Sequence, residues 1–247
     1  MTDADRSDDI GRHATLFTTV TSPLFATRGS QRWLQVAVAR APELLQEALR
    51  TSGALDYGET VDWKSPLGTE NFCEYRDGAV LRCLGIDHLP NRKLSEFWPA
   101  GGPVWDALGT TSEGRHLLVE AKAHIAEAAS PASQASEKSL EVIRSSLAEA
   151  RRYYSPRSTA EWSGSLYQYA NRLAFQYFFA KVNGLPSRLV FLNFCNAVDV
   201  SGPESEAEWH GATKLIHSLL GVPDDLRNRG VFHAFVDARK LTDIALQ

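Results

Sequence analysis

The second half of the sequence alternates short apolar runs with longer amphipathic segments, and this order constrains the fold more than any other feature. Residues 104–125 contain two apolar runs, "VWDALG" and "LLVEAKA", joined through the turn-like "TTSEG", which predicts two paired strands. The elements predicted to follow are two helices over 130–154 and 163–184, a strand over 187–198, a helix over 204–221 and a strand over 230–238. This order predicts an α/β protein in three layers, with a central mixed β-sheet flanked by helices.

The first hundred residues predict helices. A helical segment covers residues 30–53, where Pro42 splits it or begins a second helix. Another covers 69–85, after a loop-like stretch over 54–70. We therefore divide the chain into a flexible N-terminal segment, an N-terminal helical part packed on the core, and the core itself, over residues 1–28, 29–100 and 101–247.

Composition and charge exclude several classes of protein. The chain of 247 residues is 43% hydrophobic and 23% charged, which suits one compact domain with an extension. Its three cysteines are widely spaced, which argues against a disulfide framework or a zinc site. No apolar run has membrane-spanning length and the N-terminus is acidic and polar, so we expect a cytoplasmic protein that binds no membrane. The net charge of -4 neither indicates nor excludes a nucleic-acid groove.

Three charged residues stand inside the predicted strand pair: Asp106 in the first run, Glu120 and Lys122 in the second. Burying an unpaired charge is costly, so charges at such positions require partners or a function. Because side chains alternate across a strand, Glu120 and Lys122 share a face. With the turn centred near Ser112, Asp106 lies opposite Leu118 and diagonal to Glu120, near enough for both carboxylates to reach one ion.

Two carboxylates at this distance repel each other unless one is protonated or a cation lies between them. Oxygen ligands suit Mg2+ or Mn2+, and the main-chain carbonyl of Ala121 offers a further oxygen. Lys122 would then orient an attacking water or neutralise charge on a phosphate. The three side chains are therefore those required for metal-assisted hydrolysis of a phosphodiester.

The pattern of Asp106, thirteen intervening residues and then Glu120-Ala121-Lys122 in an apolar strand resembles the motif of the restriction-endonuclease-like PD-(D/E)xK phosphodiesterase superfamily. Trp105 stands where the name of the motif has proline, at a position that varies widely. The resemblance covers residues 104–195 and implies a sheet core flanked by helices, a magnesium site and usually a DNA substrate. On this basis we interpret the chain as a Mg2+-dependent nuclease, with DNA favoured over RNA and residues 101–247 as the nuclease-like core.

The resemblance also implies two supporting residues. Several nuclease branches carry a glutamine on the helix after the E-x-K strand, and Gln168 takes that place, although Arg172 stands where those branches have a tyrosine. Many relatives add an acid from an upstream helix, for which we choose Glu74 over the competing acids Glu43, Glu47 and Glu70. The expected catalytic residues are Asp106, Glu120, Lys122 and Gln168, and the expected metal ligands are Asp106, Glu120, Ala121 and Glu74.

Other interpretations of the same residues stay open. The three charges could form a structural ion pair at a sheet edge, where inward charges discourage aggregation. A superfamily member that keeps the acids without catalysis would act as a nucleic-acid- or protein-binding module, and a hydrolase of small phosphoesters is a third alternative. The sequence leaves the oligomeric state undecided, and a homodimer is compatible with it.

Overall fold

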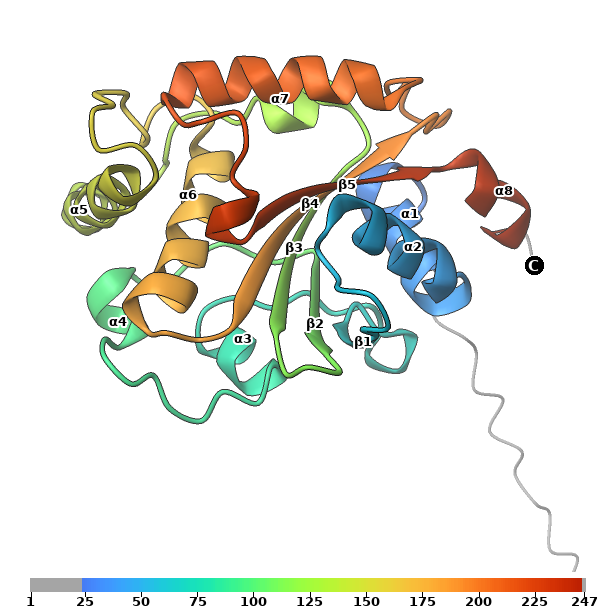
Figure 1. The fold of residues 1–247 in the computed structure, drawn as a ribbon, viewed down its shortest axis with the longest axis horizontal. Helices are drawn as coiled ribbons and strands as arrows, with labels where there is room; N and C mark the ends of the chain where they lie inside the picture. Colours follow the sequence, from blue (N-terminus) through green and yellow to red (C-terminus); the bar gives the residue numbers. More distant parts are fainter. Residues whose placement is uncertain (1–23, 246–247) are drawn as a thin grey trace, which may run out of the picture.

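The computed structural model describes residues 24–245, in which five strands form one sheet (Figure 1). In the order in which they lie side by side, the strands are β1 (Val61–Ser65), β2 (Ala107–Thr111), β3 (His116–Lys122), β4 (Ser187–Cys195) and β5 (Val231–Asp237). β2 is antiparallel to both β1 and β3, whereas β3, β4 and β5 are parallel. The predicted mixed central sheet is therefore confirmed.

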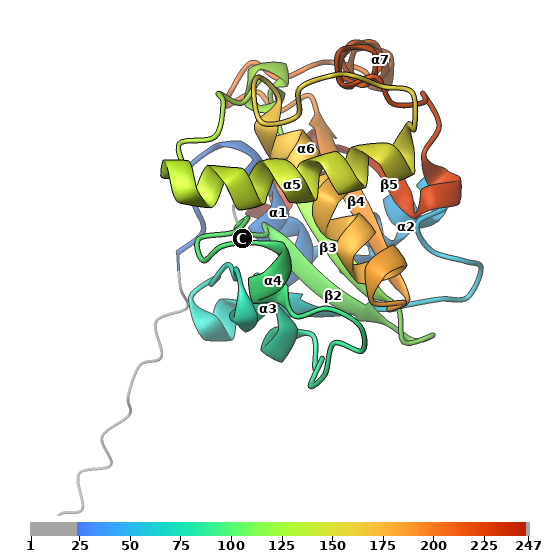
Figure 2. The same ribbon diagram turned by 90° about the vertical axis from the view of Figure 1, so that its left-hand side faces the viewer.

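Helices cover both faces of the sheet, as the predicted three layers require (Figures 1 and 2). One face is covered by α3 (Gly78–Cys83), α4 (Leu94–Phe97), α5 (Glu137–Tyr154), α6 (Tyr167–Gln176) with its π-helical continuation η3 (Tyr177–Val182), and α7 (Glu206–Leu220). The other face is covered by α1 (Gly29–Arg40), α2 (Pro42–Ser52) and α8 (Arg239–Ala245). Three short 3-10 segments complete the elements of the described residues: η1 (Gly68–Glu70), η2 (Ile125–Ala128) and η4 (Arg227–Arg229).

Strand β3 is buried on both faces, which explains its nearly continuous apolar sequence. Leu117, Val119 and Ala121 belong to the core beneath α1 and α2, and Leu118 belongs to the core beneath α5 and α6. Strand alternation places Glu120 on the same face as Leu118. The α6-side face of β3 therefore changes from apolar to charged towards the end of the strand.

The register of the β2–β3 hairpin differs from the predicted one by two residues. Ala107 pairs with Val119, so that Asp106, one residue before β2, is in line with Glu120 and not with Leu118. The turn is centred on Glu113, one residue beyond Ser112, and Gly114 next to it adopts a positive φ of 74°. A shift of two residues keeps every side chain on its face, so Asp106 and Glu120 still share one.

The helix predicted over 69–85 is wrong, because only α3 at its end is α-helical. Phe72 and Asp77 both have positive φ values, which interrupt a helix. Between them, Tyr75 accepts a main-chain hydrogen bond of 2.9 Å from Trp105, and the Asp77 carboxylate accepts bonds from the amides of a distant glycine pair. Contacts with the segment before β2 therefore outweigh the local helical pattern, and they bring Glu74 next to that segment.

The N-terminal part is only partly as predicted. The two helices over 30–53 are confirmed, with the break at Pro42, but the stretch over 54–70 contributes strand β1 to the sheet. The expectation of a flexible segment falls mostly on residues 1–23, which lie outside the described residues. Within the described part, none of the helices is long and apolar enough to cross a membrane.

Candidate functional site

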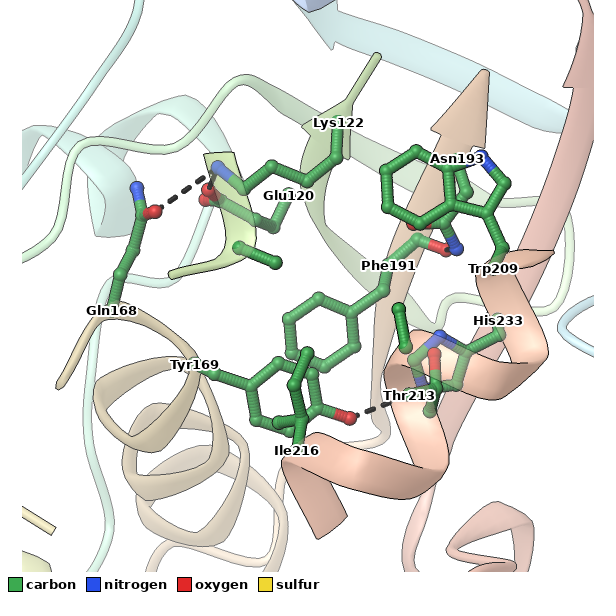
Figure 3. A pocket seen from close by; sticks show the side chains of 12 residues that line it. Glu120, Lys122, Gln168, Tyr169, Phe191, Asn193, Trp209, Thr213, Ile216 and His233 are labelled. Atoms are coloured by element: carbon green, nitrogen blue, oxygen red, sulfur yellow. Dashed lines mark hydrogen bonds and ion pairs between the residues drawn. The ribbon is translucent and has the colours of Figure 1, made fainter. Parts of the chain in front are cut away.

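The hairpin brings together the three charges that interrupt its apolar runs. Lys122 and Glu120 form an ion pair, with 2.5 Å between the lysine Nζ and the glutamate Oε1 (Figure 3). Asp106 reaches the same strand from the side of β2, where its Oδ2 accepts a hydrogen bond of 2.7 Å from the amide of Ala121. Because β2 begins only at Ala107, the amide of Ala121 on this side of β3 binds a side chain and not the main chain of β2.

Gln168 joins this group from the first turn of α6. Its Oε1 accepts a hydrogen bond of 3.0 Å from Lys122 Nζ, as Figure 3 shows. The main-chain amide of Gln168 donates to the hydroxyl of Ser130 at 2.8 Å, which fixes the start of the helix. Lys122 therefore has one carboxylate partner and one amide partner, on two different elements.

Arg172 is the site residue whose role the sequence did not predict. Its guanidinium donates from Nε to Glu120 Oε2 at 2.6 Å, and a terminal nitrogen lies 2.5 Å from the same oxygen. The guanidinium also donates to the carbonyl of Val104 at 2.7 Å and to Asn171 Oδ1 at 2.9 Å, and its carbon lies 4.7 Å from the ring centroid of Trp105. The one sequence signal for this contact is position, because Arg172 follows Gln168 by one helical turn.

The electrostatics of the site assign different charge states to the two carboxyl groups. Burial raises the pKa of Glu120, but Arg172 and Lys122 outweigh burial and hold that pKa below its usual value. Burial, followed by repulsion from Glu120, raises the pKa of Asp106 to about 8. Of the two carboxyl groups, Asp106 is therefore the one that more readily holds a proton.

The four glutamates considered as an upstream metal ligand differ in their distance from the site and in their partners. Glu74 lies near the site, where burial and the charge of Glu120 raise its pKa, and its Oε1 accepts a bond of 3.0 Å from Gln31. Glu70 accepts a hydrogen bond from the hydroxyl of Tyr75. The other two competing acids, Glu43 and Glu47, are on α2, which packs on the opposite face of the sheet.

The donor atoms of the site fit a hard divalent cation only in part. Asp106 and Glu120 supply carboxylate oxygens, and the Ala121 carbonyl points to the same side of β3 as the amide that Asp106 binds. However, the described residues contain no group of three His, Cys, Asp or Glu side chains placed to hold a metal. The expected third acidic ligand, Glu74, is therefore not placed with Asp106 and Glu120 to bind a metal ion. Oxygen atoms of water or substrate would have to complete the coordination shell of the ion.

A pocket opens beside the charged group on the side of α7 and β5 (Figure 3). Its floor and walls are mostly aromatic and apolar, and include Tyr169, Phe191, Trp209, Ile216 and His233. Glu120, Lys122 and Gln168 form one end of the same pocket. Glu120 is only 1% exposed, but its side chain lines this pocket.

Comparison with known proteins gives no match to this chain among protein-family models, curated proteins or solved structures.

Proposed function

We propose that this protein is a metal-dependent phosphodiesterase of the PD-(D/E)xK type that hydrolyses nucleic acid, with DNA as the favoured substrate. The observation that supports this proposal is the convergence of Glu120, Lys122 and Gln168 at one end of a pocket, with Asp106 bound to the main chain of β3 between Glu120 and Lys122. Two neighbouring carboxylates with a lysine that touches one of them form the arrangement that such chemistry requires.

The residues of the chain would divide the work as follows. Asp106, Glu120 and the carbonyl of Ala121 would hold Mg2+ or Mn2+. The bound ion would polarise the phosphate and lower the pKa of a water molecule at the site. Lys122, oriented by Gln168, would place the attacking water or balance the charge that develops on the phosphate.

The proposal is tested by cleavage of single-stranded DNA, duplex DNA, RNA and a chromogenic phosphodiester, with Mg2+ and with EDTA. We expect Mg2+-dependent cleavage that Asp106→Ala and Lys122→Met abolish. Lys64→Met is the matched control, because Lys64 also pairs with a carboxylate two residues away but lies on β1, at the edge of the sheet. Cleavage by the Lys122→Met variant at the rate of the control would contradict the proposal, and a preference for the small substrate would favour a phosphoesterase.

A second function, a binding module without catalysis, is favoured by one observation. Both oxygens of Glu120 are already paired with cations, and the described residues offer no third acidic ligand. Thermal unfolding with added Mn2+ separates the two functions. A metal site gives Mn2+-dependent stabilisation that Asp106→Ala removes, whereas a binding module gives none in either protein.

A further inference from the structure

The two cations that bind Glu120 differ in how firmly they are held. The side chain of Arg172 is 3% exposed and is fixed by a carbonyl, an amide and an aromatic ring in addition to the carboxylate. The side chain of Lys122 is 13% exposed, and its ammonium binds only Glu120 Oε1 and Gln168. Lys122 has a flexible four-carbon stem, so its ammonium can move away from Glu120 and stay bound to Gln168. The guanidinium of Arg172 is held in place by its other contacts.

A divalent cation bound to Glu120 would therefore be repelled by the guanidinium of Arg172, which stays in place. Arg172 and the metal ion would share one carboxylate in a largely buried site, where charges interact more strongly than in water. The same ion pair stabilises the metal-free protein, because it neutralises a carboxylate that is 1% exposed. The charge of Arg172 thus stabilises the metal-free protein but weakens the binding of a metal ion to Glu120.

We propose that Arg172 is a built-in counter-ion of Glu120, a positioning residue that stabilises the metal-free site and lowers its affinity for divalent cations. Lys122 is the cation that gives way when the metal binds. This inference rests on the metal site of the proposed function and adds to it a residue that sets the metal affinity.

Arg188 provides a matched control elsewhere in the chain. Its guanidinium donates to the carbonyl of Ala54 at 2.6 Å and lies 3.5 Å from Glu59, whose side chain is 1% exposed. Glu59 keeps a second cation, Arg115, at 2.7 Å when Arg188 is removed, as Glu120 keeps Lys122 when Arg172 is removed. Both arginines thus pair with a buried glutamate and donate to a main-chain carbonyl, but Arg188 lies farther from its carboxylate, also pairs with Asp56 and does not adjoin the site.

The test is Mn2+ binding to the full chain, measured as free Mn2+ by electron paramagnetic resonance and as a shift of the unfolding temperature. We expect Arg172→Met to unfold at a lower temperature without metal and to bind Mn2+ at least about tenfold more tightly than the wild type. Arg172→Lys keeps the charge and should restore wild-type affinity to within about threefold, although its stability stays reduced. Arg188→Met should lose stability with unchanged Mn2+ affinity. Arg172→Gln is measured in parallel, in case the methionine variant does not fold.

Equal Mn2+ affinity in the wild type and both neutral Arg172 variants would overturn the inference, and so would weaker binding by those variants. These results leave the proposed function standing if the wild type cleaves nucleic acid. Conversely, suppose that the wild type and its variants bind Mn2+ with the expected differences in affinity, but the wild type cleaves no nucleic acid. This result would refute the nuclease and support the role of Arg172. A wild type that binds no Mn2+ would overturn both.

Discussion

Asp106 offers the sharpest test of the site electrostatics, through the substitution Asp106→Asn. Burial and the neighbouring Glu120 raise the pKa of Asp106 from 3.8 to about 8. The folded protein thus holds, between these pH values, a proton that the unfolded chain releases. The resulting contribution to stability is fully present below the unfolded pKa and is lost as the pH rises through the folded pKa. A pKa difference of one between the folded and unfolded states corresponds to about 1.4 kcal/mol of stability, so the whole effect is on the order of several kcal/mol.

An asparagine at this position keeps an oxygen that can accept the hydrogen bond from the Ala121 amide, but it cannot ionise. We therefore expect the free energy of unfolding of Asp106→Asn, relative to the wild type, to increase with pH up to about pH 8 and to level off above it. The slope should be at most about 1.4 kcal/mol per pH unit.

The assay is urea unfolding followed by circular dichroism, in EDTA, at one-unit steps from about pH 5 to about pH 9. Asp62→Asn serves as the control, because the side chain of Asp62 is 72% exposed and pairs with Lys64 on β1. A difference between Asp106→Asn and the wild type that does not change with pH would refute the reasoning, since it would mean that Asp106 titrates alike in the folded and unfolded states.

Three further predictions concern neighbouring contacts. Glu120→Ala should lower the free energy of unfolding by about 3–5 kcal/mol in urea titrations, because it leaves the buried Arg172 unpaired; adding Arg172→Met should recover part of this loss, and a fully additive double variant would contradict the pairing. Gln168→Leu removes the amide oxygen that accepts a hydrogen bond from Lys122. It should reduce Mg2+-dependent kcat by about tenfold, with little change in the free energy of unfolding. Unchanged kcat would remove Gln168 from the site. Gly202→Ala should destabilise the fold by about 1–3 kcal/mol, because the added Cβ would lie 2.2 Å from a main-chain oxygen just past β3. Gly211→Ala on α7 is its control and should be neutral or stabilising in thermal unfolding, since its Cβ would meet no atom within 4 Å.

Two errors of the sequence-based prediction have a common cause. Strand β1 is short and places charged residues such as Asp62 and Lys64 towards solvent at the sheet edge, so its pattern resembled a loop. The residues around Tyr75 had helical spacing, but their main chain pairs with Trp105, thirty residues further along. In both places a contact with a distant segment decided the local structure.

The sequence by itself determined that Glu120 and Lys122 share a face of one strand and that Asp106 comes from the other arm of the same hairpin. It also determined the layers of the fold, because both follow from local periodicity. Only the tertiary structure decided that Arg172 pairs with Glu120, and that Glu74 lies near the site without joining it. The physical reason is that periodicity specifies the direction in which a side chain points. The partner that it meets there depends on how separate elements pack, and an ion pair across 52 residues of chain leaves no local pattern.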